Sequence, residues 1–262
     1  MKKISIEEAV ALLQREPYEN AMDLYELQFL QKNNRETFVY HGEDVLIYAS
    51  RYHTADPISV TVIPLCASWN WEETMAFLQS VWDRMNLLVR VQKLSETDRE
   101  ACKASYAVRY PFRKAYTTYA AEPDAAGTVH ENVRLLTPDD KEAFTAMDWE
   151  PVQYRPDPAR LFDIFVTKGA GKILACLEEG KVLGFLSYDR MFDNWYGVDY
   201  IYTSPGRTGQ GIGTALAEAY VYQVKQAGGI PVYDNPQVEA SRRIALKSGF
   251  TLLTEKYRFA QD

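Results

Sequence analysis

The spacing of apolar positions changes along the chain, and this alternation predicts a protein built from both helices and strands. Ile4, Ile6, Val10 and Leu13 recur at helical spacing, and Pro17 ends that run. Residues 58–66, ISVTVIPLC, are instead β-branched and almost continuously apolar, as in a buried strand. Read in this way, the first 120 residues predict two helices, three strands, a helix, a strand and a helix, with AYTTYA as a candidate final strand.

The pattern is clearer after residue 130. It predicts in turn the strand ENVRLLT, the helices TPDDKEAFTAM and DPARLFDIFVTKG, the hairpin KILACLEEGKVLGFLSYDR, the strand YGVDYIYTS, the long helix GIGTALAEAYVYQVKQAGG, the strand IPVYD, the helix VEASRRIALKSGF and the strand FTLLTEKYRFA. Strands that alternate with helices predict an α/β fold, with a mixed α+β sheet covered by helices.

A change in composition separates the two parts. Residues 120–129, AAEPDAAGTV, are small, contain Pro and Gly and have few large apolar side chains, which is typical of a linker. We therefore expect an N-terminal α/β domain at 1–125 and a second domain at 126–262. The coarse order of elements is alike in the two, although no residue-level repeat is visible, so the sequence leaves open a duplication.

Composition narrows the classes of function. The formal net charge is -7, which argues against a nucleic-acid partner because phosphate binding needs clustered Lys and Arg. Cys66, Cys102 and Cys176 are far apart and the three histidines form no cluster, so we expect reduced thiols and no metal site. No apolar run reaches about 18 residues, and the N-terminus reads as an amphipathic helix, so we expect no membrane association and a cytoplasmic location.

The most informative segment is YIYTSPGRTGQGIGTAL at residues 200–216, where a strand leads through a proline and four glycines into the long helix. Backbone N–H groups and the helix dipole at such a junction favour an anion, and a pyrophosphate is the natural candidate. The spacing departs from the Rossmann fingerprint, because Thr214 and Leu216 stand where its last glycine would be. No Gly-Lys-Ser or Gly-Lys-Thr follows, which argues against a Walker A loop.

This segment resembles the acyl-CoA loop of the GCN5-related N-acetyltransferase (GNAT) family, Gln/Arg-x-x-Gly-x-Gly/Ala after a strand and a proline. The match runs from Thr208 to Gly213, with Thr208 in place of Gln or Arg and Arg207 one residue earlier. The family's usual ending, Lys-x-Gly-Phe before the last strand, is present from Lys247 to Phe250. The resemblance covers about half the chain and implies a GNAT fold in the C-terminal half. It also makes a degenerate GNAT-like domain one reading of the N-terminal half.

The resemblance implies acetyl-CoA as co-substrate, with its pantetheine along a free strand edge and its pyrophosphate on the amides that precede the long helix. The residues expected to bind it are Ile201, Tyr202, Thr203, Arg207, Thr208, Gly209, Gln210, Gly211, Ile212, Gly213 and Thr214. It also implies direct attack of an amine on the thioester, assisted by a base and by an acid for the thiolate.

One departure affects the chemistry. Many family members carry an acidic tyrosine two residues before the Lys of the ending, and here that residue is Ala245. Ser241, one helical turn earlier, or a tyrosine from elsewhere are the alternatives for the acid, which a thiol leaving group also makes dispensable. Asp199, on the fourth strand of the family's order, is the candidate base, with Asp189 at the end of the third strand and Asp193 in the loop as alternatives. The ending loosely resembles zwittermicin-A-resistance-type GNAT acetyltransferases, which carry a similar additional N-terminal half.

Two functions remain open at this point. The first is an N-acetyltransferase that acts on a small-molecule amine, which the negative net charge suits. The second is an acyl-CoA-binding or interaction module with lost or weak catalysis. Ala245, in place of the acidic tyrosine, is the observation that suggests it. We expect the N-terminal half to bind the acceptor or to form a homodimer, and the sequence leaves both open.

Overall fold

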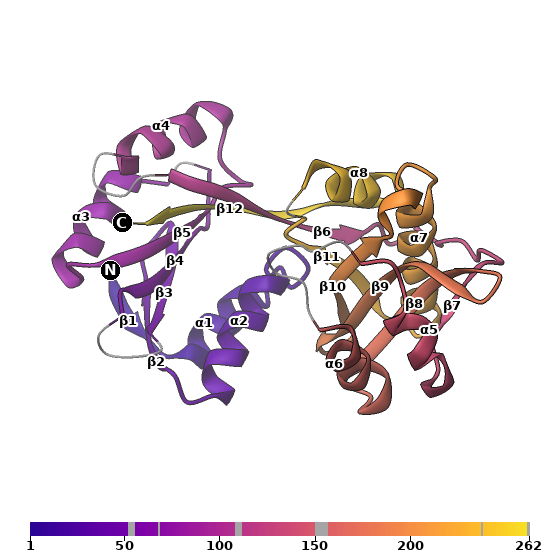
Figure 1. The fold of residues 1–262 in the computed structure, drawn as a ribbon. Coiled ribbons are helices and arrows are strands. Elements are labelled where there is room, and N and C mark those ends of the chain that lie inside the picture. Colours follow the sequence, from indigo (N-terminus) through magenta and orange to yellow (C-terminus); the bar gives the residue numbers. More distant parts are fainter. Residues whose placement is uncertain (52–55, 68, 108–111, 150–156, 237, 261–262) are drawn as a thin grey trace. The chain divides into compact units, whose positions relative to one another are not determined.

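The computed structural model describes residues 1–262 except 52–55, 68, 108–111, 150–156, 237 and 261–262 (Figure 1). The chain forms two compact units. Unit 1 comprises Met1–Thr117 together with Leu253–Asp262, and unit 2 comprises Thr118–Leu252. None of the helices that the described residues form is both long and apolar enough to span a bilayer.

Unit 1 carries the elements β1 (Lys2–Ile4), α1 (Ile6–Leu13), α2 (Ala21–Lys32), β2 (Glu36–His41), β3 (Val45–Arg51), β4 (Ile58–Pro64), α3 (Trp71–Val81), β5 (Met85–Arg90) and α4 (Glu96–Ala107). Its sheet has the order β1-β2-β3-β4-β5-β12, and β4 and β5 are parallel. Side-chain caps begin α1 and α3, since Ser5 and Glu8 form a capping box on α1 and the Asn70 side chain caps α3.

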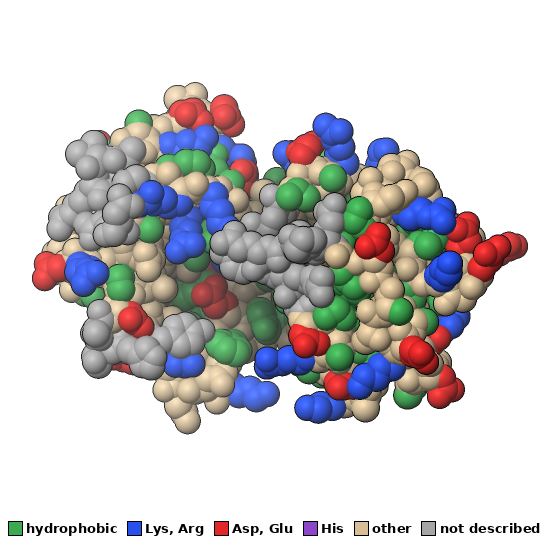
Figure 2. Space-filling model, in the orientation of Figure 1, with side chains coloured by type: hydrophobic (Ala, Val, Ile, Leu, Met, Phe, Trp, Pro, Cys, Tyr) green, Lys and Arg blue, Asp and Glu red, His purple; other side chains and the backbone are tan. Residues whose placement is uncertain are grey.

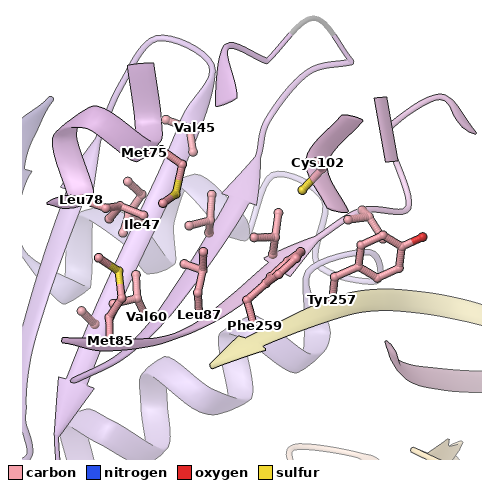
Figure 3. Close-up of a cluster of buried hydrophobic side chains, with 14 of the residues drawn as sticks. Val45, Ile47, Val60, Met75, Leu78, Met85, Leu87, Cys102, Tyr257 and Phe259 are labelled. Atoms are coloured by element: carbon pink, nitrogen blue, oxygen red, sulfur yellow. The ribbon is translucent and has the colours of Figure 1, made fainter. Parts of the chain in front are cut away.

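Apolar side chains fill both faces of this sheet. On one face Met75 and Leu78 of α3 pack over Ile47 and Leu87, and Phe259 of β12 completes the cluster (Figure 3). On the other face α1 and α2 bury Leu13 and Leu27 against β2, β3 and β4. The sheet of unit 1 is therefore covered by helices on both sides.

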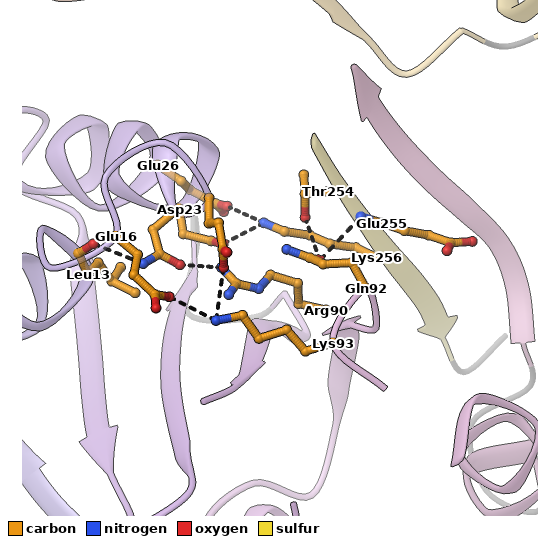
Figure 4. A network of polar contacts seen from close by, with 12 residues as sticks. Leu13, Glu16, Asp23, Glu26, Arg90, Gln92, Lys93, Thr254, Glu255 and Lys256 are labelled. Atoms are coloured by element: carbon orange, nitrogen blue, oxygen red, sulfur yellow. Dashed lines mark hydrogen bonds and ion pairs between the residues drawn. The ribbon is translucent and has the colours of Figure 1, made fainter. Parts of the chain in front are cut away.

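A buried ionic network accompanies the second of these cores. The carboxylate of Asp23, 1% exposed, lies 2.6 Å from Lys256 Nζ and 3.0 Å from an Arg90 guanidinium nitrogen (Figure 4). Arg90 also donates to the Asn20 side chain at 2.5 Å, and the Tyr48 hydroxyl donates to Asp23 at 3.1 Å. Burial by itself would raise the pKa of Asp23, but Lys256 and Arg90 outweigh it and hold that pKa below its usual value.

Unit 2 carries the elements β7 (Val133–Leu135), η1 (Pro138–Asp140), α5 (Lys141–Thr145), α6 (Pro158–Phe162), η2 (Asp163–Thr167), β8 (Gly171–Glu178), β9 (Lys181–Phe192), β10 (Trp195–Thr203), η3 (Pro205–Arg207), α7 (Ile212–Gln226), β11 (Ile230–Asp234) and α8 (Glu239–Lys247). Its sheet has the order β6-β11-β10-β9-β8-β7. Helix α7 packs on one face, where Leu216 and Tyr220 are fully buried, and α5 and α6 pack on the other, where Phe144 and Phe162 are fully buried.

Charges of both signs lie on the face of unit 2 that Figure 2 draws. On the face drawn in Figure 2, acidic and basic side chains of its described residues are interspersed. The net charge of -7 is therefore not gathered there into one acidic patch.

Strands β6 (Phe112–Ala121) and β12 (Phe250–Ala260) each belong partly to both units. The end of β6, in unit 2, pairs with β11 from Val232↔Ala120 to Asp234↔Thr118. The end of β12, in unit 1, pairs with β5 from Lys256↔Arg90 to Ala260↔Asn86. Unit 1 thus obtains the end of β12 from a segment that follows unit 2 in sequence, and unit 2 begins inside β6, so a single boundary at 125/126 does not describe the two units.

The segment expected to be a linker is packed against unit 2. Lys225 of α7 donates to the carbonyl oxygens of Glu122 and Pro123, and the Thr128 N–H donates to the Glu218 carbonyl at 3.2 Å. At Gly127 the chain approaches the α7 backbone so closely that a Cβ would lie 2.3 Å from the Tyr222 nitrogen. Its small residues therefore serve close packing on a helix, and not the freedom of a tether.

Candidate acyl-CoA site

The site begins where two parallel strands separate. Strands β10 and β11 pair only from Trp195↔Ile230 to Gly197↔Val232. Beyond Gly197, β10 continues to Thr203 beside β9, whereas β11 continues beside β6. The edge of β10 from 198 to 203 therefore has no β11 partner, and an extended ligand can hydrogen-bond to it as an added strand.

A β-bulge lies at the inner end of this edge. Val198 pairs with Tyr188 of β9 and Tyr200 with Ser187, so Asp199 is the extra residue. Bulges redirect a side chain and commonly occur next to active sites. Here the bulge brings the Asp199 carboxylate into the wall of a cavity.

The cavity has a volume of about 680 Å³ and lies wholly in unit 2. It is lined by the edge of β10, the loop before α7, the end of β11 and one face of α8. The residues predicted from the sequence that line it are Asp199, Ile201, Tyr202, Thr203, Arg207, Thr208, Gly209, Gly211, Ile212, Gly213, Thr214 and Ser241. Gln210 belongs to the same loop but is not among the lining residues.

The loop before α7 presents free amides to the cavity. Gly211 is the N-cap of α7, has φ +81° and supplies no side-chain cap. A Cβ at Gly211 would meet no atom within 4 Å, so the space above this turn is open. The Ala215 N–H donates a hydrogen bond to the Gly211 carbonyl, and this bond links the first turn of α7 to the loop. An anion at this helix start would be held by N–H groups and by the helix dipole.

Gly213 serves a different purpose from Gly211. A Cβ there would lie 2.6 Å from Ile244 Cδ1, so the missing side chain lets α7 approach α8 closely. The two side chains expected to assist the phosphates already have protein partners. Arg207 pairs with Glu178 at 2.8 Å and the Thr208 hydroxyl donates to the Pro205 carbonyl at 3.2 Å, so each would have to exchange a partner to reach a ligand.

This donor set fits the diphosphate and pantetheine of coenzyme A. Consecutive loop amides at the start of a long helix suit a diphosphate, and the unpaired β10 edge suits the amide groups of pantetheine. No side chain occupies the space above Gly209 or Gly211 among the described residues. These groups are therefore free to take the ligand that the loop pattern predicts.

Asp199 has the properties of a base. Its side chain is exposed in the wall of the cavity, where the surrounding protein removes part of its hydration. This desolvation, together with the nearby Asp189 carboxylate, raises the pKa of Asp199 to about 7. Burial also raises the pKa of Asp189. A carboxylate that titrates near neutral pH is suited to accept a proton from an ammonium group.

Sequence reasoning missed one part of the site. Tyr233 of β11 and Ser241 of α8 both line the cavity, and their hydroxyl oxygens lie 2.8 Å apart. Tyr233 stands in the apolar strand IPVYD, where a core position is the natural reading, and only the fold brings it to α8. Ala245, at the position of the family's tyrosine, is fully buried.

The segment 189–196 forms a tight hairpin between β9 and β10. Asp193 at its turn has φ +42°, and the Arg190 side chain donates to the Asp193 carbonyl. Phe192 and Trp195 stack on each other with ring centroids 5.6 Å apart. Phe192 and Trp195 therefore pack against each other within the hairpin.

The equivalent position in unit 1 is closed. Strands β4 and β5 remain paired over five positions, from Ile58↔Met85 to Val62↔Val89. The start of α3 is capped by the Asn70 side chain, and the Asn70 N–H donates to Asp44 at 3.0 Å. Glu72 and Glu73 occupy its first turn. A phosphate there would meet carboxylates and an occupied cap, so these residues are unsuited to coenzyme A.

Comparison with known proteins agrees with this geometry. Residues 137–250 match the acetyltransferase (GNAT) family model. This segment is therefore a GNAT domain, an acetyl-CoA-dependent acyltransferase domain, and the predicted mixed α+β fold is confirmed. No curated protein matches the chain significantly.

Solved structures similar to the chain extend over both units. A GNAT-family acetyltransferase from Colwellia psychrerythraea has 10% identity and a TM-score of 0.58, covering 100% of this chain and 99% of that one. A GCN5-related N-acetyltransferase from Sphaerobacter thermophilus has 12% identity and a TM-score of 0.56, covering 98% and 93%. A Drosophila protein has 11% identity and a TM-score of 0.57, covering 99% and 98%. At these identities the likeness concerns the fold alone.

Proposed function

We propose that the chain transfers an acetyl group from acetyl-CoA to the amine of a small molecule by direct attack. The observation that carries this proposal is the opening between β10 and β11, because it leads from the free amides before α7 to the Asp199 carboxylate within one cavity. Acetyl-CoA would supply the acetyl thioester. The protein would supply an anion site at one end of the opening and a proton acceptor at the other.

The residues of the chain have distinct tasks in this proposal. The amides from Gly209 to Gly213 hold the diphosphate, and the free edge of β10 aligns the pantetheine. A backbone N–H on that edge stabilises the oxyanion that forms on the acetyl carbonyl. Asp199 accepts the proton that the amine must lose, directly or through water. Ser241, on the opposite wall of the cavity, faces the leaving group.

Several features support an amine that arrives as a cation. Asp199 and Asp189 are neighbouring carboxylates, and each has a raised pKa. An ammonium group between them would relieve their mutual repulsion. The loose resemblance of the chain's ending to zwittermicin-A-resistance-type acetyltransferases also favours a small-molecule acceptor. For unit 1, we propose that it binds the acceptor or mediates a homodimer, since its own cofactor position is closed.

The alternative is an acyl-CoA-binding module with weak or lost catalysis. The observation that favours it is Ala245, a buried methyl group where the family usually presents an acidic tyrosine. The two proposals agree on cofactor binding and differ in whether acetyl transfer to an amine occurs afterwards. Calorimetry with acetyl-CoA, and then a screen of small amines for release of free CoA thiol above the rate of hydrolysis, separates them.

We expect micromolar or tighter binding of acetyl-CoA and amine-dependent thiol release. Binding without turnover across a broad amine panel supports the binding module. No binding, and no shift of the melting temperature by acetyl-CoA, contradicts both.

A further inference from the structure

Two hydroxyl groups that line the cavity lie close to each other, one on β11 and one on α8. Tyr233 is 2% exposed and Ser241 is half-buried, and their oxygens are 2.8 Å apart. Ser241 lies four residues before Ala245, so the two share one face of α8, one turn apart. Ser241 therefore offers a hydroxyl one turn before the position at which the family usually carries its tyrosine.

The position of the pair follows from the strand register. Gly197↔Val232 is the last pair between β10 and β11, so Tyr233 is the first β11 residue beyond the point of separation. The β10 edge from Thr203 to Val198 spans roughly 17 Å at the usual rise per residue. The diphosphate loop lies near one end of that length and the Tyr233–Ser241 pair near the other, beside the Asp199 bulge.

We propose that the Ser241 hydroxyl donates a hydrogen bond to the thiolate sulfur of coenzyme A as it leaves, and that Tyr233 positions Ser241 for this task. The inference rests on the proposed acetyl transfer. In that reaction the amine nitrogen forms a bond to the acetyl carbon, the carbon–sulfur bond breaks, and its electron pair stays on sulfur. Asp199 takes the surplus proton from nitrogen and passes it to solvent, and solvent protonates the thiolate. Ser241 keeps its proton throughout.

Either hydroxyl of the pair can donate to the other, and the proposal requires that Tyr233 donates to Ser241. The Tyr233 ring is held edge-on to Phe250 with centroids 5.7 Å apart. Burial raises the pKa of Tyr233 to about 12, so its hydroxyl keeps its proton at neutral pH. When that proton is donated to Ser241 Oγ, the serine proton is left to point elsewhere, and the cavity is the space that Ser241 also faces.

A hydrogen bond of this kind acts on the charged sulfur and not on the rest of the cofactor. Hydrogen bonds to charged groups stabilise by about 1.5–3 kcal/mol, which corresponds to roughly one to two pKa units. The pair should therefore lower the pKa of the CoA thiol when CoA is bound. A purely structural role of Tyr233 in the core would leave that pKa unchanged.

The test compares wild type, Ser241→Ala and Tyr233→Phe, with Tyr222→Phe as a control that removes a phenol outside the cavity. Two quantities are measured on the full chain: the affinity for desulfo-CoA, which lacks the sulfur, and the apparent pKa of the thiol of bound CoA from its ultraviolet thiolate absorbance. The other charged residues lining the cavity are the same in all four proteins, so their influence on the thiol cancels: Asp199, Arg207, Asp234, Arg243 and Lys247.

We expect similar desulfo-CoA affinity in all four proteins. The thiol pKa should rise by about one unit in Ser241→Ala and by a smaller amount in Tyr233→Phe, and should stay at the wild-type value in Tyr222→Phe. Unchanged thiol pKa in Ser241→Ala overturns the inference and leaves acetyl transfer standing. A change in Ser241→Ala without one in Tyr233→Phe overturns the positioning role of Tyr233. Failure of the wild type to bind desulfo-CoA contradicts the proposed function itself.

Discussion

Lys256 Nζ lies 2.6 Å from Asp23 Oδ1, which ties β12, near the end of the chain, to α2, near its beginning. Both residues are buried in unit 1, and Arg90 of β5 contacts the same carboxylate. Unit 1 is therefore held together by a strand that the chain supplies only after unit 2 is complete. This arrangement makes the last ten residues part of the N-terminal unit.

Replacing Asp23 should destabilise unit 1 strongly. In Asp23→Ala the buried Arg90 loses its carboxylate partner and Lys256 is left with Glu26 at 3.9 Å, and breaking such a buried pair costs about 3–5 kcal/mol. Chemical denaturation measures the loss. Glu36→Ala, which removes an exposed ion pair with Arg51, is the control and should cost less than about 1 kcal/mol. A similar small loss in both variants would contradict the importance of the network.

The same carboxylate should contribute to acid sensitivity. Because the folded pKa of Asp23 lies below its ordinary value, its contribution to stability is complete above the pKa of unfolded Asp, about 3.9, and is lost as the pH falls through the folded pKa. The free energy of unfolding of wild type should therefore fall more steeply below pH 4 than that of Asp23→Ala. Parallel curves in acid would show that the pKa of Asp23 is the same in the folded and the unfolded chain.

Separating the two units by truncation should fail. A chain that starts at residue 128 lacks β6, which leaves Val232 to Asp234 of β11 without their partner strand, and its residues 253–260 lose β5. We expect such a fragment to be insoluble or to lack a cooperative unfolding transition. Co-expression with residues 1–127 is the control and should restore solubility. A soluble fragment 128–262 with a sharp transition would show that unit 2 does not need β6.

Gly211→Glu should abolish binding of acetyl-CoA. A glutamate there must adopt φ +81°, and it would place a carboxylate where the diphosphate is expected. We expect a loss of affinity on the order of 100-fold or more, measured by calorimetry. Gly228→Glu is the matched control. Gly228 likewise has a positive φ, +71°, and open space for a Cβ, but it lies at the opposite end of α7. Both variants should lose similar stability, and only Gly211→Glu should lose affinity.

The rate of acetyl transfer should depend on Asp199 and on pH. A base must be deprotonated to act, and the pKa of Asp199 is raised to about 7. The value of kcat/KM should therefore rise with pH up to about 7, and ionisation of Asp199 should cause no further rise above that pH. Asp199→Asn should lower kcat/KM by roughly 100-fold and remove that limb. Its melting temperature at pH 8 should not fall, because the variant removes a carboxylate whose ionisation the folded state disfavours. An unchanged pH profile would exclude Asp199 as the base.

Much of unit 2 could be predicted because its signals are local. The backbone must turn sharply or approach a neighbour closely at the glycines from Gly209 to Gly213 and in the ending from Lys247 to Phe250. Such positions favour glycine, so they can be recognised from the residue types. The alternation of strands and helices likewise follows from the spacing of apolar residues. The loop, the long helix and the edge of β10 were thereby placed from sequence.

What could not be predicted depends on pairing between distant segments. The sequence of β12 contains nothing that distinguishes pairing with β5 from pairing with a strand of unit 2, since both present apolar edges. Predicting the contact between Tyr233 and Ser241 would require the position of α8 relative to β11. Side-chain packing in the folded protein sets that position. The residues 122–129 resemble a tether in composition, and only their contacts with α7 reveal a packed segment.

The central claim is that the amides before α7 hold the diphosphate of coenzyme A and that the cofactor then lies along the free edge of β10. A crystal structure of the chain with acetyl-CoA tests this most directly. The account predicts diphosphate oxygens within hydrogen-bonding distance of the N–H groups from Gly209 to Gly213, and the thioester beside Asp199 and Ser241. A cofactor bound elsewhere, or one whose thioester lies far from β10, would contradict it.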